Sequence, residues 1–173
     1  MKVAMKQAKL ARLMQRAKRL ACEYHRLTGK PLGVTAEVAE CEAAEKLGLT
    51  LSTARTPFFD ARKGRTRFQI KGRAISASSK YRGRVPSIKC DGKFAVLLVL
   101  LDQKIFQTIE IWQARRSKVA KRLAKPGSKA HNERHSMGIT QFKSIAKKVW
   151  PPPSGRLRAP RPGEAQTAPS QMI

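Results

Sequence analysis

Acidic residues are scarce in this chain. Its 173 residues include 11 Asp and Glu against 37 Lys and Arg, which gives a formal net charge of +26. Such an excess of one sign destabilises a compact protein by self-repulsion unless a polyanion shares its surface. Nucleic acid is the commonest polyanion, and the sequence pI of ≈ 11.2 fits it. A membrane surface or an acidic protein would also neutralise the charge, but we favour nucleic acid.

Cysteines and long apolar runs are also few. Cys22, Cys41 and Cys90 are far apart and odd in number, so they indicate neither a disulfide framework nor a zinc finger. The longest apolar run, Phe94 to Leu101, has eight residues and is too short to cross a bilayer. With 41% hydrophobic residues, the chain still has enough apolar side chains for a core. We therefore expect a cytoplasmic protein that does not bind membranes.

Helix signals occur in both halves of the chain. Apolar residues at three- and four-residue steps predict an amphipathic helix over residues 8–27, and Lys and Arg on its other faces favour phosphate contact over an ordinary solvated surface. A second, Ala-rich helix is predicted over residues 35–47, with Thr35 as its N-cap and Gly48 as its stop. Two more helices are expected at about 115–124 and 139–149.

Strand signals lie between the helices. Residues 58–62 and 66–71 flank a hairpin-like turn at 63–65, and the apolar run 94–101 is typical of a central strand covered on both faces. Residues 105–112 are predicted to be its antiparallel neighbour, and residues 72–93 a basic surface loop. The fold class is thus α/β, with a mixed sheet of about four strands flanked by helices and a basic N-terminal helix.

The domain boundary is predicted at a change of composition. From Pro151 onward six of 23 residues are proline, so residues 151–173 are expected to form a disordered basic tail. Residues 1–150 then form a single domain.

The few acidic residues are concentrated in one predicted helix. Four of the eleven lie on the second predicted helix: Glu37, Glu40, Glu42 and Glu45. Glu40 falls within the stripe of small residues that should pack on the sheet, and Glu37 lies at its edge, whereas the other two point elsewhere. A carboxylate on a packing stripe must reach a cation, a metal ion or a water-filled site. Pairing with one of the many Lys or Arg side chains is an equally good explanation.

A second group of polar residues lies on the predicted hairpin. In the strand 66–71 the side chains of Arg67, Gln69 and Lys71 share one face, and Asp60 lies on the preceding strand. Asp60, Gln69 and Lys71 are therefore expected to converge, with Glu37 or Glu40 contributed by the helix. Oxygen ligands from Asp, Glu and Gln suit Mg²⁺ or Mn²⁺.

The order of a helix Glu, Asp60, and Gln69-x-Lys71 resembles the active-site signature of the PD-(D/E)XK nuclease superfamily. Stretches at 33–43, 69–73, 128–134 and 141–145 resemble more closely a restriction-endonuclease-like bacterial family of unknown function. The resemblance covers roughly residues 29–150 and implies a restriction-endonuclease-like core and a nucleoid-associated protein. It also implies that Asp60, Gln69 and Glu37 or Glu40 hold Mg²⁺ or Mn²⁺ while Lys71 positions the attacking water. Gln69 departs from the usual Asp or Glu and adds no negative charge.

The leading hypothesis is a Mg²⁺-dependent DNA endonuclease or DNA-processing phosphodiesterase. Two alternatives stay open: a catalytically inactive DNA-binding module on the same fold, and a basic RNA-binding protein. Many nucleases of the superfamily dimerise, so a homodimer is also considered, although no dimer seam is identifiable in the sequence. Phosphate contacts are expected from basic side chains of the first helix, the hairpin, the loop and the last helix: Arg12, Arg16, Arg19, Arg67, Arg73, Lys80, Arg82, Arg84 and Lys143.

Overall fold

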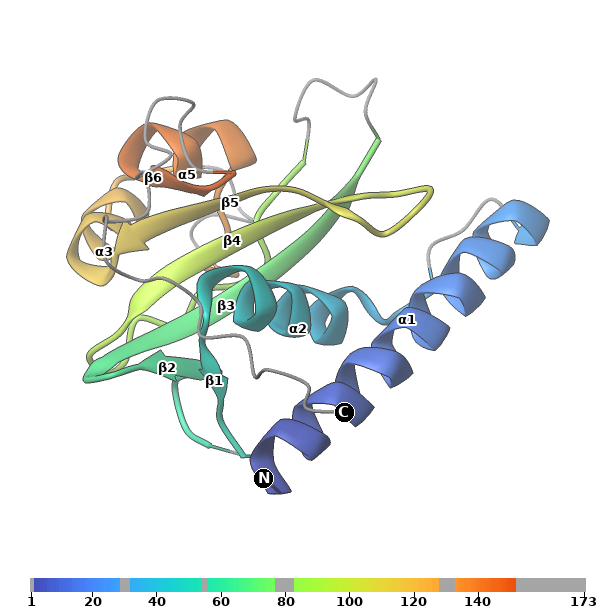
Figure 1. Ribbon diagram of the computed structural model, residues 1–173. Helices are drawn as coiled ribbons and strands as arrows, with labels where there is room; N and C mark the ends of the chain where they lie inside the picture. The colour runs from blue at the N-terminus through green and yellow to red at the C-terminus, as the bar shows by residue number, and fades with distance from the viewer. Residues whose placement is uncertain (1, 29–31, 54–55, 77–82, 128–132, 152–173) are drawn as a thin grey trace, which may run out of the picture.

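The computed structural model describes residues 2–28, 32–53, 56–76, 83–127 and 133–151 (Figure 1). Residues 152–173 of the predicted tail and two predicted phosphate contacts, Lys80 and Arg82, lie outside these ranges. No helix within them is both long and apolar enough to span a membrane.

The core of the fold is a mixed six-stranded sheet whose strands lie side by side in sequence order. Within it, β3 and β4 run parallel, and the other neighbouring strands are antiparallel. The α/β class and the mixed sheet confirm the prediction, but the sheet has six strands instead of about four. The strands are β1 (Thr50–Leu51), β2 (Ala61–Lys63), β3 (Thr66–Ile75), β4 (Ala95–Asp102), β5 (Thr108–Arg115) and β6 (Lys147–Trp150).

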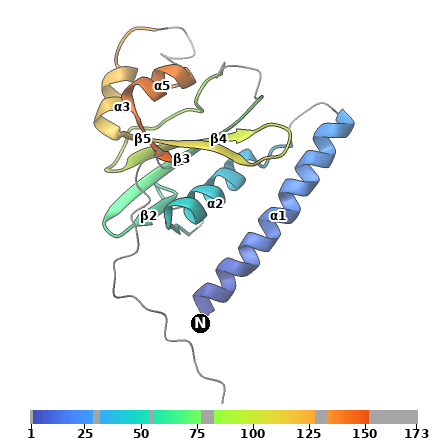
Figure 2. The ribbon, with the colours of Figure 1, turned by 45° about the horizontal axis from the view of Figure 1, so that its top comes forward.

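Helices cover both faces of the sheet (Figures 1 and 2). On one face lies α2 (Thr35–Leu47), with the long helix α1 (Lys2–Thr28) packed outside it. The other face carries α3 (Arg116–Leu123) and α5 (Ile139–Ile145). Two apolar clusters fill these layers, one beneath α2 and one beneath α3 and α5. Because β4 lies between them, its residues from Val96 to Leu101 are fully buried, as its unbroken apolar run predicted.

The packing of α2 on β3 is very close. A Cβ added to Gly72 would lie 2.6 Å from the Cβ of Ala39 and 2.7 Å from the carbonyl oxygen of Thr35. The Ala-rich composition of α2 therefore allows the helix to lie directly on the strand. The helix ends at Gly48, which has a left-handed φ of 63° as predicted, but its N-cap is Val34, and Thr35 is the first helical residue.

Several sequence predictions are wrong at their ends. The first helix begins at Lys2 instead of residue 8, and the strand expected at 58–62 is Ala61–Lys63, because the left-handed φ of Phe58 interrupts extended backbone. The last helix stops at Ile145, and residues 147–150 form the edge strand β6, because Val149 and Trp150 pack against the core beneath α2 while their backbone pairs with β5. Strand β3 continues through residues 72–75, and the segment after it buries Val85 and Ile88 beneath α3 and α5. Strand β5 begins at residue 108 instead of 105, since residues 103–107 form the preceding turn.

Candidate functional site

The candidate site lies where the hairpin of β2 and β3 opens. The two strands pair only over residues 61–63 and 66–68, although β3 runs on to Ile75. Asp60 lies at the opening, and three hydrogen bonds fix it. Its N–H donates to the Phe68 carbonyl (2.8 Å), its carbonyl accepts from the Ser52 N–H (2.8 Å), and its Oδ2 accepts from the Ile70 N–H (2.6 Å). The Asp60 carboxylate is therefore held in place, and its other oxygen can accept a further ligand.

Gln69 is the next residue of the site. One step beyond the Ala61–Phe68 pair, the strand register brings Gln69 beside Asp60. The Gln69 side chain is buried, and among the described residues its Oε1 has no hydrogen-bond partner. A buried amide oxygen without a hydrogen-bond partner lowers the stability of the folded protein. A bound ion that this oxygen ligates would explain why Gln occupies this position.

Glu40 and Lys71 complete the group. Burial, together with the negative charges of Asp60 and Glu37, raises the pKa of Glu40 to about 7, and the nearby Lys71 ammonium opposes that rise. Burial also lowers the pKa of Lys71, with a smaller effect in the same direction from Lys89, while Asp60 and Glu40 act in the opposite sense. Helix α2, the residue just before β2 and strand β3 thus bring Glu40, Asp60 and Lys71 into one electrostatic environment.

The structure distinguishes between the two candidate helix carboxylates. Glu37 is exposed, whereas Glu40 is partly buried. Glu37 affects the site through its charge on Glu40. We therefore assign Glu40 to the centre of the group and Glu37 to its rim.

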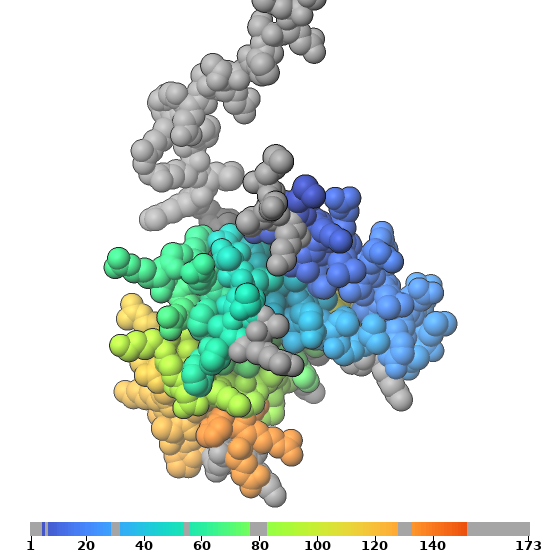
Figure 3. Space-filling view, turned by 90° about the horizontal axis from the view of Figure 1, so that it is seen from below, coloured from blue at the N-terminus to red at the C-terminus, as the bar shows by residue number. Residues whose placement is uncertain are grey.

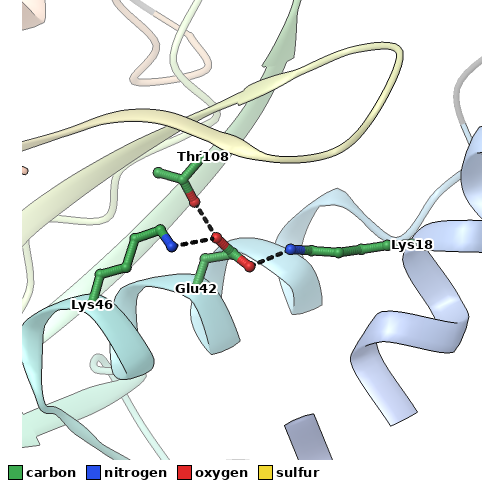
Figure 4. Close-up of polar contacts among 4 residues, drawn as sticks. All are labelled: Lys18, Glu42, Lys46 and Thr108. Atoms are coloured by element: carbon green, nitrogen blue, oxygen red, sulfur yellow. Dashed lines mark hydrogen bonds and ion pairs between the residues drawn. The ribbon is translucent and has the colours of Figure 1, made fainter. Parts of the chain in front are cut away.

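One prediction about α2 is wrong: the buried acid of this helix is Glu42, which was expected to point away from the packing stripe. Figure 4 shows Lys18 of α1 and Thr108 of β5 donating to the Glu42 carboxylate, with the Lys46 ammonium 3.2 Å away. Burial would raise the pKa of Glu42, but these hydrogen bonds and the two lysine charges outweigh it and lower the pKa. Pairing of a helix acid with Lys therefore occurs at Glu42, because α2 packs against α1 as well as against the sheet.

A cleft of about 580 Å³ lies next to this ion-pair cluster. Its walls come from α1, α2, the turn before β5 and Trp150. The two lysines that line it, Lys18 and Lys46, are both paired with Glu42. The site residues Glu40, Asp60, Gln69 and Lys71 do not line it. The cleft is therefore separate from the candidate site.

The predicted phosphate contacts fall into two groups. Five of them are exposed, three on α1 and two on β3: Arg12, Arg16, Arg19, Arg67 and Arg73. The other two described residues are held inside the fold. Arg84 donates to the Ser136 carbonyl (2.6 Å), and Lys143 pairs with Glu110 and lies 4.6 Å from the centre of the Trp112 ring. Arg84 and Lys143 thus stabilise the fold and are weaker candidates for phosphate contact.

Two residues near the site were missed by sequence reasoning. Lys89 lies close enough to Lys71 to influence its pKa. Phe58 lies two residues before Asp60, and its side chain is 53% exposed. Its φ is 70°, and the Phe59 N–H donates a hydrogen bond to the Pro57 carbonyl (3.0 Å). This is the geometry of a classic γ-turn, which is rare and strained. Pro57 is a turn signal that could have indicated the bend at Phe58. No sequence pattern indicated that Lys89 lies near the site.

No family model matches the chain, and a search of curated proteins finds no significant match. Nor does any group of three or more His, Cys, Asp or Glu side chains in the described ranges lie in a position to hold a metal ion. A metal site around Asp60 would therefore depend on the amide oxygen of Gln69.

Proposed function

We propose that the chain is a Mg²⁺-dependent DNA endonuclease or DNA-processing phosphodiesterase with a restriction-endonuclease-like core. The observation that carries the proposal is the unpaired, buried Oε1 of Gln69. Gln69 lies on the strand that carries Lys71, one register step from Asp60, whose carboxylate is fixed by the Ile70 N–H. The net charge of +26 supports a polyanionic substrate.

The donor set fits a hard divalent cation. Asp60 and Glu40 offer carboxylate oxygens and Gln69 an amide oxygen, which are the ligand types that Mg²⁺ and Mn²⁺ prefer. With at most two carboxylates at its centre, the site should bind the cation weakly alone and more tightly when a DNA phosphate completes the shell. When bound, the cation would supply Lewis-acid polarisation of the phosphate and a lower pKa of an attacking water.

The protein's own groups have matching roles. The ammonium of Lys71 lies beside the acids and can donate hydrogen bonds to the attacking water and to the phosphate oxygens as negative charge develops on them. The pKa of Glu40, about 7 without a cation, allows this carboxylate to take up or release a proton near neutral pH. The backbone bonds of Asp60 keep its carboxylate oriented without rearrangement.

Nuclease assays with Mg²⁺ or Mn²⁺ on duplex, single-stranded and branched DNA test the proposal. Asp60→Asn should abolish cleavage and leave DNA affinity unchanged or higher, because a negative charge facing the phosphate is lost. Lys71→Ala should also abolish cleavage but weaken binding slightly. Gln69→Glu is the discriminating change: in a metal site it restores the commoner ligand and should preserve or raise activity.

The contrary outcome is equally clear. A structural Gln69 would become a buried acid when replaced by Glu, and the stability of the protein should fall. Absence of Mg²⁺- or Mn²⁺-dependent cleavage of every DNA and RNA form, together with a destabilised and inactive Gln69→Glu variant, would refute the nuclease.

The second candidate is a DNA-binding module on the same fold without catalysis. The uncharged Gln69 at a ligand position favours it, as does the lack, within the described residues, of three His, Cys, Asp or Glu side chains placed to hold a metal ion. For such a module, the logarithm of the DNA-binding constant should fall with the logarithm of salt concentration, with a slope of about −0.9 for each neutralised phosphate. We expect roughly 5 to 10 neutralised phosphates and no cleavage. Competition between duplex DNA and structured RNA distinguishes both candidates from a basic RNA-binding protein.

A further inference from the structure

The outer side of α1 carries a row of exposed apolar side chains. Leu13, Leu20 and Leu27 are 53%, 59% and 79% exposed, and Leu10 and Tyr24 are 36% and 37% exposed. With the partly buried Ala17, the row advances along the helix in steps of three, four, three, four and three residues. That spacing is the heptad pattern of a coiled-coil seam. Its residues are Leu10, Leu13, Ala17, Leu20, Tyr24 and Leu27.

This seam is not the face that holds α1 on its own domain. Lys18 and Ala21 are the buried residues of the helix, and Cys22 packs against the same core cluster as Ala21. On a helical projection the centre of the buried face lies roughly 120° from the centre of the seam. Figures 1 and 3 show α1 along one side of the molecule, beside α2. Because Leu13, Leu20 and Leu27 are more than half exposed, a second helix can approach the seam.

We propose that the seam binds the seam of a second copy of the chain, with the two α1 helices antiparallel. In this orientation the seam is self-complementary. Leu10 faces Leu27 of the second copy, Leu13 faces Tyr24, and Ala17 faces Leu20, and the two-fold axis repeats each pair. All six seam residues thereby gain an apolar partner, as an isologous dimer requires.

Charge selects the antiparallel orientation. Glu23 is the only acidic residue of α1 and lies beside the seam on the same flank as Arg16. An antiparallel pair places Arg16 against Glu23 of the second copy, twice per dimer. A parallel pair would instead place Arg16 against Ala21 and Glu23 against Thr28, without any ion pair. Within one helix, Arg16 and Glu23 are seven residues, or about 10 Å, apart and do not pair.

The dimer does not depend on the proposed nuclease activity. The remaining arginines of α1 repel their copies, and added salt screens this repulsion without weakening the apolar seam. Self-association should therefore strengthen as salt rises, whereas phosphate binding should weaken. This opposite salt dependence separates failure of the dimer from failure of the proposed function.

Sedimentation velocity of the full chain without DNA, over a range of micromolar concentrations and at low and moderate salt, tests the seam. We expect a reversible monomer–dimer equilibrium. Leu13→Gln and Leu20→Gln should each raise the dissociation constant by about tenfold or more, since each change affects the dimer twice. Both side chains are exposed in the monomer, so circular dichroism should show unchanged folding. Met5→Gln is the matched control, because Met5 is 73% exposed on α1 but off the seam, and it should leave the dimer unchanged.

Charge reversal tests the orientation. Arg16→Glu and Glu23→Arg should each weaken the dimer by placing like charges together, and the double variant Arg16→Glu/Glu23→Arg should restore it. A chain that stays monomeric at every concentration, or a dimer unaffected by the two leucine changes, would overturn the proposal. A dimer that the double variant fails to restore would overturn the antiparallel register.

Discussion

Replacing Glu40 by Gln should stabilise the protein at alkaline pH and leave its stability nearly unchanged at acidic pH. The pKa of Glu40 rises from its ordinary 4.5 to about 7 in the folded protein, because of burial and the charges of Asp60 and Glu37. The folded state therefore binds this proton more tightly than the unfolded chain. Stability should fall as pH rises from about 4.5 to about 7, and the full penalty should remain above that range.

The size of the effect follows from the same values. Each pH unit between 4.5 and about 7 corresponds to about 1.4 kcal/mol, so the upper bound on the penalty is about 3 kcal/mol. Glu40 is only partly buried, and water screens part of its interaction with the neighbouring charges. We therefore expect Glu40→Gln to raise the free energy of unfolding by about 1–2 kcal/mol at pH near 8 and by almost nothing at pH near 4.

Chemical denaturation at several pH values measures this difference. Glu45→Gln is the matched control, since it makes the same substitution at an exposed position of the same helix, and it should show no comparable pH dependence. Equal effects of Glu40→Gln at both pH values, or a loss of stability at pH near 8, would refute the conclusion that burial and the neighbouring carboxylates raise the pKa of Glu40.

Three further predictions concern packing and strain. Gly72→Ala should destabilise the fold by about 1–3 kcal/mol, because the new methyl group would overlap α2, and denaturant midpoints measure it. Glu42→Ala should cost about 3–5 kcal/mol in the same assay, because it leaves Lys18 buried without its partner; a Lys18→Met/Glu42→Met double variant should be less destabilised than Glu42→Ala. Phe58→Gly should be more stable than Phe58→Ala by about 1 kcal/mol, since Gly adopts a φ of 70° without strain; equal stabilities would contradict the γ-turn.

Local sequence patterns determined much of the fold. The continuous apolar run of β4 predicted a central strand because a strand buried on both faces has no polar side. Gly48 marked the end of α2 because the terminating residue needs a left-handed φ. Gly64 likewise marked the turn between β2 and β3, although the pairing of Lys63 with Thr66 was not predicted. These features depend on residues close together in the chain, so the sequence alone was sufficient.

Edge strands were not predictable in the same way. Residues 147–149 were expected to end the last helix, yet residues 147–150 form β6 by pairing with β5. The two-residue β1 likewise exists only through its pairing with β2. In both cases the hydrogen-bond partners lie in another part of the chain, and the local composition does not encode them.

The sequence also determined which residue types the site contains, but the tertiary structure decided the role of each. A helical projection placed Glu40 on the packing stripe and Glu42 away from it, because it assumed that α2 packs on one surface. In the fold α2 packs on both β3 and α1, so Glu42 is buried against Lys18 and Glu40 remains beside Asp60 and Lys71. The periodicity of α1 is equally plain in the sequence, but only the position of the domain against its other face shows that the leucine seam stays exposed.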